Sequence, residues 1–137
     1  MVKRREGERR RTAFRRRCSA MGQMVDNRIA AHLHLAEGYV SRAFCIKPSE
    51  FYSKTRGRRH VAEARQLVMY LAHVEFGLPL REVGLRYDRD RTTASHACRA
   101  TEDRRDDPGF DDIVRDIEAL ISLRNDPLFR PAAGERQ

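Results

Sequence analysis

Two short segments with helical periodicity, residues 79–86 and 91–105, lie about four residues apart in this chain. Gly77 stands where a helix C-terminal glycine belongs, and Pro79 suits the first turn of the helix that follows. Asp90 is a favourable N-cap for the second segment. Two short helices joined in this way have the layout of a helix-turn-helix, and their spacing restricts the fold more than any other feature.

The rest of the chain also shows helical periodicity, and no alternating run of strand length occurs. Apolar residues recur at helical spacing over residues 24–44, about 60–76 and about 109–123, and Pro48 cannot continue the first of these helices. The sequence therefore predicts an all-α fold, a multi-helix bundle that contains a helix-turn-helix. The apolar residues expected in the core include Leu33, Ala36, Val40, Ile46, Phe51, Val61, Ala64, Leu67, Val68, Leu71, Ala72, Phe76, Val83, Leu85 or Tyr87, Ala94, Ala97, Phe110, Ile113, Ile117, Leu120 and Ile121.

Charge is distributed unevenly along the 137 residues, whose formal net charge is +8. Residues 1–17 hold nine Arg and Lys against two Glu, and residues 42–99 hold twelve basic against six acidic residues. Residues 102–118 have the opposite balance, with three basic and eight acidic residues. One basic and one acidic region in a small domain predict an oriented field and a polyanionic partner, most commonly nucleic acid.

The chain length and composition predict one folded domain with two flexible ends. Residues 1–20 are expected to form a basic disordered arm, residues 21–124 the folded domain, and residues 125–137 a flexible tail. The arm either contacts phosphates without sequence preference or serves only as a solubilising tail. No apolar run is long enough for a membrane span or a secretory signal, so we expect a cytoplasmic, nucleoid-associated protein.

The three cysteines, Cys18, Cys45 and Cys98, lack CxxC spacing and indicate a reduced compartment. We expect Cys45 to be buried beside Phe44 and Ile46, and Cys98 to be a small core residue. The acidic stretch EDRRDDPGFDD could serve a metal-dependent nuclease, but acids also stabilise the N-terminus of the helix expected at 109–123. We therefore predict no catalytic residue, no metal and no cofactor.

Several separated motifs resemble one known family. The chain reads ARQ at 64–66, MYLA at 69–72, L-x-E-V-G within 80–84, R-D-x-T-T at 89–93 and HA at 96–97. This pattern resembles the DNA-binding C-terminal domain of DnaA, the bacterial chromosomal replication initiator, and the resemblance covers roughly residues 24–123. It implies an all-α domain whose helix-turn-helix places its second helix in the major groove of double-stranded DNA.

The resemblance also implies roles for individual residues. Base edges would be read by Arg89, Asp90, Arg91, Thr92, Thr93 and His96, whose side chains have donors, acceptors and methyl groups suited to that task. Arg65 and Gln66 would hold phosphates, and one of Arg56, Arg58 and Arg59 would enter the minor groove. The alternatives are a surface ion pair for Arg65, a solvated charge run for the loop arginines, and helix capping for Asp90, which is compatible with base contact.

Three features depart from the family pattern. Arg91 stands where the family has a base-reading histidine, and the YDRD turn is shorter than the family's Gly-rich turn. No GxxxxGK[ST] motif occurs, so neither the family's ATPase domain nor nucleotide binding is expected. A transcriptional regulator is the first hypothesis, with a replication-control factor that competes for initiator boxes and a protein-interaction adaptor as alternatives. A homodimer through helix 24–44 is left open.

Overall fold

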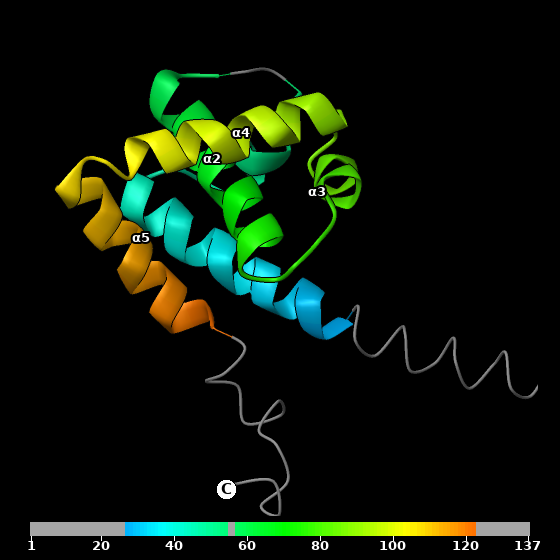
Figure 1. Cartoon of the computed structure of the whole chain (residues 1–137). Coiled ribbons are helices and arrows are strands. Elements are labelled where there is room, and N and C mark those ends of the chain that lie inside the picture. The colour runs from blue at the N-terminus through cyan, green and yellow to red at the C-terminus, as the bar shows by residue number, and fades with distance from the viewer. Residues whose placement is uncertain (1–26, 55–56, 123–137) are drawn as a thin grey trace, which may run out of the picture. The chain divides into compact units, whose positions relative to one another are not determined.

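The computed structural model describes residues 27–54 and 57–122. The chain is helical over residues 27–44 and then forms η1 (Pro48–Tyr52), α2 (Arg59–Val74), α3 (Leu80–Arg86), α4 (Arg91–Arg104) and α5 (Pro108–Ile121) (Figure 1). No strand occurs within the described ranges, and the predicted all-α fold is confirmed. The predicted arm and tail lie outside the described residues. None of the described helices has the length and apolar character needed to cross a membrane.

α2 is the central helix and packs against η1, α3 and α4. Figure 1 shows α4 crossing α2, with α3 beside the first turn of α4. The apolar residues predicted for α2 are all buried, as are the two alanines, Ala94 and Ala97, that α4 turns toward it. Small side chains on α4 allow the axes of α2 and α4 to approach closely. Because α4 packs on α2 through this face, its opposite face is left exposed.

Three apolar residues considered for the core, in α3 and α5, are exposed. Leu85 is 71% exposed whereas Tyr87 is fully buried, which decides between the two alternatives for the end of α3. On α5, Ile113 and Leu120 are 43% and 54% exposed, and Val114 is buried instead. The buried stripe of α5 is therefore narrower than the run of apolar residues, because this helix packs along one side only.

The prediction that Cys45 is buried was wrong. Cys45 follows the helix over residues 27–44 with a φ of +56°, and its side chain is exposed. The left-handed backbone reverses the chain at this point and turns the thiol toward solvent, while Phe44 and Ile46 are only half-buried. Phe51 of η1, with no exposed surface, is the anchor of this segment.

The acidic residues after α4 serve the corner between α4 and α5. The Arg105 guanidinium donates to the carboxylates of Asp111 at 2.6 Å and Glu118 at 2.7 Å, and to the Tyr70 hydroxyl at 3.0 Å. Asp107 caps α5 by accepting a hydrogen bond from the Phe110 amide. Within the described residues no group of three or more His, Cys, Asp or Glu is arranged to hold a metal ion.

A buried carboxylate joins three elements. Glu37, in the helix over residues 27–44, is 2% exposed. Its Oε1 accepts hydrogen bonds from the hydroxyls of Tyr52 at 2.6 Å and Tyr87 at 2.8 Å, and from Nη2 of Arg86 at 3.1 Å. A buried carboxylate is tolerated only when its charge is matched and its oxygens are hydrogen-bonded. Glu37 therefore ties η1 and the end of α3 to this helix.

The turn between α3 and α4 depends on a close backbone approach. The Arg89 amide donates to the Gly84 carbonyl at 2.8 Å. A Cβ on Gly84 would lie 2.5 Å from the Arg89 carbonyl oxygen, so no other residue fits without displacing the backbone. Asp88 has a φ of +53°, a left-handed conformation that Asp tolerates better than most residues. The turn is thus closed without a glycine of its own.

Replacing Gly84 with alanine should destabilise the fold by about 1–3 kcal/mol, because the added methyl meets fixed backbone. Chemical denaturation of both proteins measures this difference. The matched control is Gly38→Ala, since a Cβ at Gly38 would meet nothing within 4 Å. The control should gain up to about 1 kcal/mol from helix propensity. Equal stability of wild type and Gly84→Ala would contradict the close approach.

Tyr87→Phe should lower the free energy of unfolding by about 1–3 kcal/mol at neutral pH, because it removes a donor from a buried carboxylate. The two tyrosines also predict alkaline sensitivity. Burial, reinforced by Glu37, raises the pKa of Tyr52 to about 12 and raises the pKa of Tyr87 still further.

A raised tyrosine pKa stabilises the folded state fully below the ordinary value of 10.0, and this contribution is lost as the pH rises through the folded-state pKa. Stability should therefore fall from about pH 10 upward, and less steeply in Tyr52→Phe. Denaturation midpoints measured from neutral pH to about pH 11.5 test this. Tyr39→Phe is the control, and a Tyr52→Phe curve parallel to that of wild type would refute it.

Candidate nucleic-acid interface

The N-terminus of α4 is capped by Asp90, as the sequence predicted. The Asp90 carboxylate accepts a hydrogen bond from the Thr93 amide at 2.7 Å. Hydrogen bonds from the side chain and the backbone of Thr93 hold the pKa of the Asp90 carboxyl below its usual range. The carboxylate is nevertheless exposed, so one of its oxygens can cap the helix while the group still faces a ligand.

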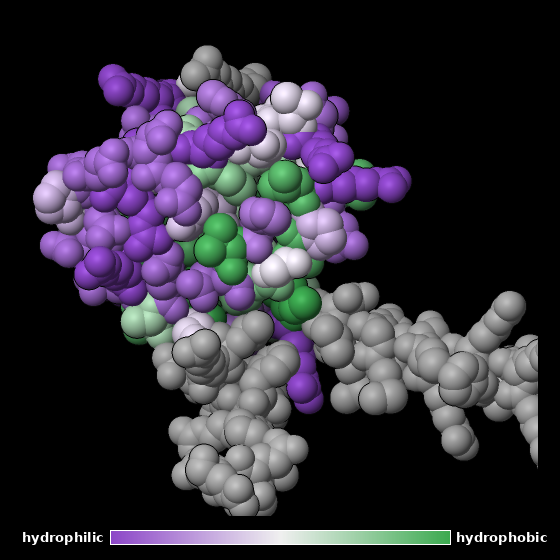
Figure 2. Space-filling view, viewed as in Figure 1, coloured by the Kyte–Doolittle hydropathy of each residue, from purple (hydrophilic) through white to green (hydrophobic). Residues whose placement is uncertain are grey.

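The outer face of α4 is polar and exposed. Arg91, Thr92, Thr93, His96 and Arg99 are all exposed and recur over successive turns of the helix. Figure 2 shows hydrophilic side chains over α4 and α5, whereas apolar side chains gather below α4, over the end of α2 and the segment that leads to α3. The exposed face of α4 therefore resembles neither a core face nor an apolar docking face.

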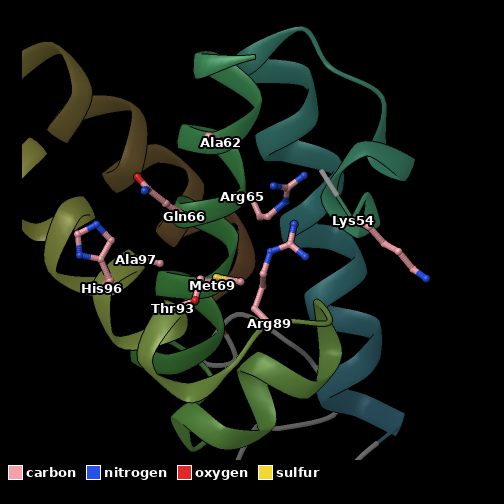
Figure 3. Close-up of a pocket in the computed structure, with 9 residues that line it drawn as sticks. All are labelled: Lys54, Ala62, Arg65, Gln66, Met69, Arg89, Thr93, His96 and Ala97. Carbon is pink, nitrogen blue, oxygen red and sulfur yellow. The ribbon is translucent and has the colours of Figure 1, made fainter. Parts of the chain in front are cut away.

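Two open depressions flank this face of α4. The first, here called the basic depression, has a volume of about 470 Å³ and is lined by Lys54, Ala62, Arg65, Gln66, Met69, Arg89, Thr93, His96 and Ala97 (Figure 3). The second has a volume of about 440 Å³ and is lined by Leu80, Arg91, Thr92, Ser95, His96 and Arg99. His96 lines both. The exposed edge of α4 is thus a ridge between two hollows, each of which contains at least two arginines.

Arg65 and Arg89 hold the inner wall of the basic depression. Arg65 is 5% exposed, and its Nη2 and Nε donate to the carbonyls of Glu50 at 2.8 Å and Phe51 at 3.2 Å. Figure 3 shows the guanidinium groups of Arg65 and Arg89 pointing toward one another. Burial, and secondarily the charge of Arg89, lowers the pKa of Arg65. Two neighbouring cations create a positive potential that favours an anion.

The remaining predicted site residues are more dispersed. Gln66 is half-buried in the basic depression, and Arg58 and Arg59 are exposed at the start of α2. Nε of Arg59 lies 3.2 Å from a Glu63 carboxylate oxygen, so the charge of Arg59 is partly matched. Arg56 lies outside the described residues. The roles predicted for these residues in binding stay predictions.

Three polar residues that line these depressions were not among the predicted site residues. Lys54 lines the basic depression directly after η1, and Ser95 and Arg99 line the second depression. Ser95 and Arg99 follow Arg91 at intervals of four residues, so helical periodicity alone places them on the same face. Lys54 carried no comparable signal, because its position depends on how η1 packs.

Comparison with known proteins supports the assignment of the fold as a domain with a helix-turn-helix. Residues 37–100 match the family described as bacterial dnaA protein helix-turn-helix. The chain is 35% identical over 102 residues to the chromosomal replication initiator protein DnaA of Lachnoclostridium phytofermentans, which covers 73% of the chain and 22% of that protein. It is 37% identical over 86 residues to the DnaA of Flavobacterium psychrophilum, covering 61% of the chain and 18% of that protein. The chain thus spans about a fifth of the length of these relatives.

Substitutions at Asp90 can separate capping from ligand contact. Asp90→Asn retains a side-chain oxygen that accepts from the Thr93 amide, so the melting temperature should stay close to that of wild type. Asp90→Ala removes the cap and should lower it. If the carboxylate also contacts a ligand, Asp90→Asn should alter DNA binding at unchanged stability. Equal melting temperatures for Asp90→Ala and wild type would show that the cap is dispensable.

Proposed function

Because residues 37–100 carry a helix-turn-helix of the bacterial DnaA type, we propose that this protein binds double-stranded DNA sequence-specifically and acts as a transcriptional regulator on the nucleoid. It acts by occupying DNA and not by catalysis. α4 is the recognition helix and enters the major groove.

The observation that carries the proposal is the ridge formed by α4 between two arginine-containing depressions. A helix inserted in the major groove has a phosphate strand on each side, and both strands need room and positive charge. The basic depression and the second depression supply these features and meet at the exposed residue His96, which lines both. An adaptor surface would have no need of two cationic hollows arranged in this way.

Base reading falls to the first turn of α4. Asp90 accepts hydrogen bonds from cytosine amino groups, and Thr92 and Thr93 offer a hydroxyl together with a methyl for thymine. Arg91 offers a bidentate donor pair to guanine O6 and N7. Both threonines and Arg91 are exposed, which supports this assignment.

Phosphate contacts fall to the basic depression. Gln66 and Lys54 line it with accessible polar groups, and the charge of Arg65 acts there although its guanidinium is bonded to the carbonyls of Glu50 and Phe51. Arg58, exposed before α2, is the described residue best placed to reach an adjacent minor groove. These contacts contribute affinity on every sequence and make it fall with salt.

Arg91 distinguishes a regulator with its own operator from a factor that competes for initiator boxes. Arginine in place of the family's histidine should shift one or two positions of the preferred site toward guanine. A shifted site would take the protein to promoters that the initiator does not occupy. An unchanged site would favour the replication-control alternative, in which the protein occupies the initiator's own boxes.

Selection of bound duplexes from a random DNA library, with wild type and with Arg91→Ala, tests the proposal. Wild type should select one motif with a guanine that Arg91→Ala no longer prefers. The variant should bind the best wild-type site more weakly by roughly 1–3 kcal/mol. An unchanged initiator box together with a neutral Arg91→Ala would refute the predicted shift.

Titration at rising salt supplies the control for this selection. Phosphate attraction is screened by salt, so a preference that survives must come from base contacts or DNA shape. If affinity collapses equally on every duplex, the protein is not a specific reader. If Thr92→Ala and Thr93→Ala leave the biological function of the protein intact, that function does not depend on base reading, as the adaptor alternative predicts.

A further inference from the structure

The side chain of Arg89 points at the end of η1. Its Nη2 donates to the Ser53 carbonyl at 2.8 Å, and its Nη1 donates to its neighbour, the Asp88 carbonyl, at 3.0 Å. The residue is half-buried, in contrast to the exposed residues Arg91 and Thr92 that follow it. Two of the five N–H donors of the guanidinium are used on backbone carbonyls, and these bonds direct the group toward η1 and not toward a base edge.

Arg89 also joins the turn to the recognition helix. Its amide is bonded to Gly84, and the next residue, Asp90, caps α4. The backbone on both sides of Arg89 is therefore fixed, and the side chain extends from this fixed point to Ser53. A displacement of Ser53 relative to α4 would have to break the Arg89 hydrogen bond first.

Ser53 is the C-cap of η1 and immediately precedes Lys54. The carbonyls of Glu50 and Phe51 within η1 are bonded to Arg65 of α2. η1 is thus held by α2, while its C-cap residue is held by the α3–α4 turn. Figure 3 shows the Lys54 side chain pointing away from Arg65 and Arg89 and outward from the basic depression.

We propose that Arg89 is a positioning residue and not a base reader: it fixes Ser53, and with it Lys54, to the N-terminus of α4. Lys54 and α4 then contact DNA as one rigid unit, Lys54 on the backbone and α4 in the groove. This inference rests on the proposed DNA-binding function, but the link between Arg89 and Ser53 exists in the free protein and can be tested there.

The test uses Arg89→Lys and Arg89→Gln in the full chain, with Arg91→Lys as the matched control. In the free protein, hydrogen exchange of the Ser53 and Lys54 amides should speed up in both Arg89 variants and stay unchanged in the control. Exchange in the middle of α2 should stay slow in all three, which shows that the fold is intact. Unchanged exchange at Ser53 and Lys54 in both Arg89 variants overturns the link.

Binding to the site selected by wild type supplies the second readout. Lys54→Ala should weaken binding about fivefold in wild type and less than about twofold in the Arg89→Lys background, because Lys54 is no longer held in place. Thr92→Ala should cost the same factor in both backgrounds. The proposal is overturned if Lys54→Ala weakens binding by the same factor in both backgrounds while Arg89→Lys relaxes the sequence preference at one base pair, as expected for a base reader.

The two readouts separate failure of this inference from failure of the proposed function. If wild type shows no sequence preference, specific reading is lost, and the exchange measurement still decides whether Arg89 positions Ser53. If wild type reads a sequence and exchange does not change, the positioning role alone is lost.

Discussion

The backbone of Arg89 lies so close to Gly84 that no side chain fits between them, and the geometry of the helix-turn-helix follows from this contact. The hydrogen bond from the Arg89 amide to Gly84 sets where α4 begins relative to α3. Each of the four residues of the turn then has a separate task. The Tyr87 hydroxyl donates to the buried carboxylate of Glu37, and Asp88 adopts the left-handed conformation. The Arg89 guanidinium donates to the Ser53 carbonyl, and Asp90 caps α4. The turn needs no glycine because Asp88 tolerates the left-handed conformation and the other three residues each form a hydrogen bond that fits the same backbone path.

The arginines at the two ends of α4 have different kinds of hydrogen-bond partner. At the α4–α5 corner, Arg105 is surrounded by the carboxylates of Asp111 and Glu118, and these hydrogen bonds raise its pKa against the effect of burial. At the other end of α4, the hydrogen bonds of Arg89 go to neutral carbonyls, which satisfy its donors and leave its charge in place. The positive charge of Arg89 thus stays available to a polyanion near the N-terminus of α4, which the helix dipole also favours for anions.

Local signals in the sequence predicted most of the fold. Helix bounds came within about two residues because Gly77, Pro79, Asp90 and Pro108 act on the backbone next to them. The buried role of Glu37 was not predicted, because a glutamate between apolar residues reads as the polar edge of a helix, and its partner Tyr87 lies 50 residues away. The phosphate role of Arg65 is implied by the family resemblance and stays a prediction. Its hydrogen bonds to the carbonyls of η1 were not predicted, because nothing local in the sequence shows that η1 lies against it. Hydrogen bonds between residues far apart in the sequence produce no periodic pattern, so they cannot be predicted from local signals.

The same division separates the residues that orient α4 from the residues that α4 exposes. Gly84 and Tyr87 are buried and fix the orientation of α4, so a change at either alters the whole surface. Arg91 and Arg99 are exposed on the ridge and make none of the contacts that orient the helix. A substitution at Arg91 leaves the turn, the cap and the core intact. Under the proposed function, the DNA sequence preference can therefore change there at little cost in stability. An arginine at position 91 is therefore compatible with the fold. Under the proposed function, it can select a different DNA site from the histidine that the family resemblance implies at this position.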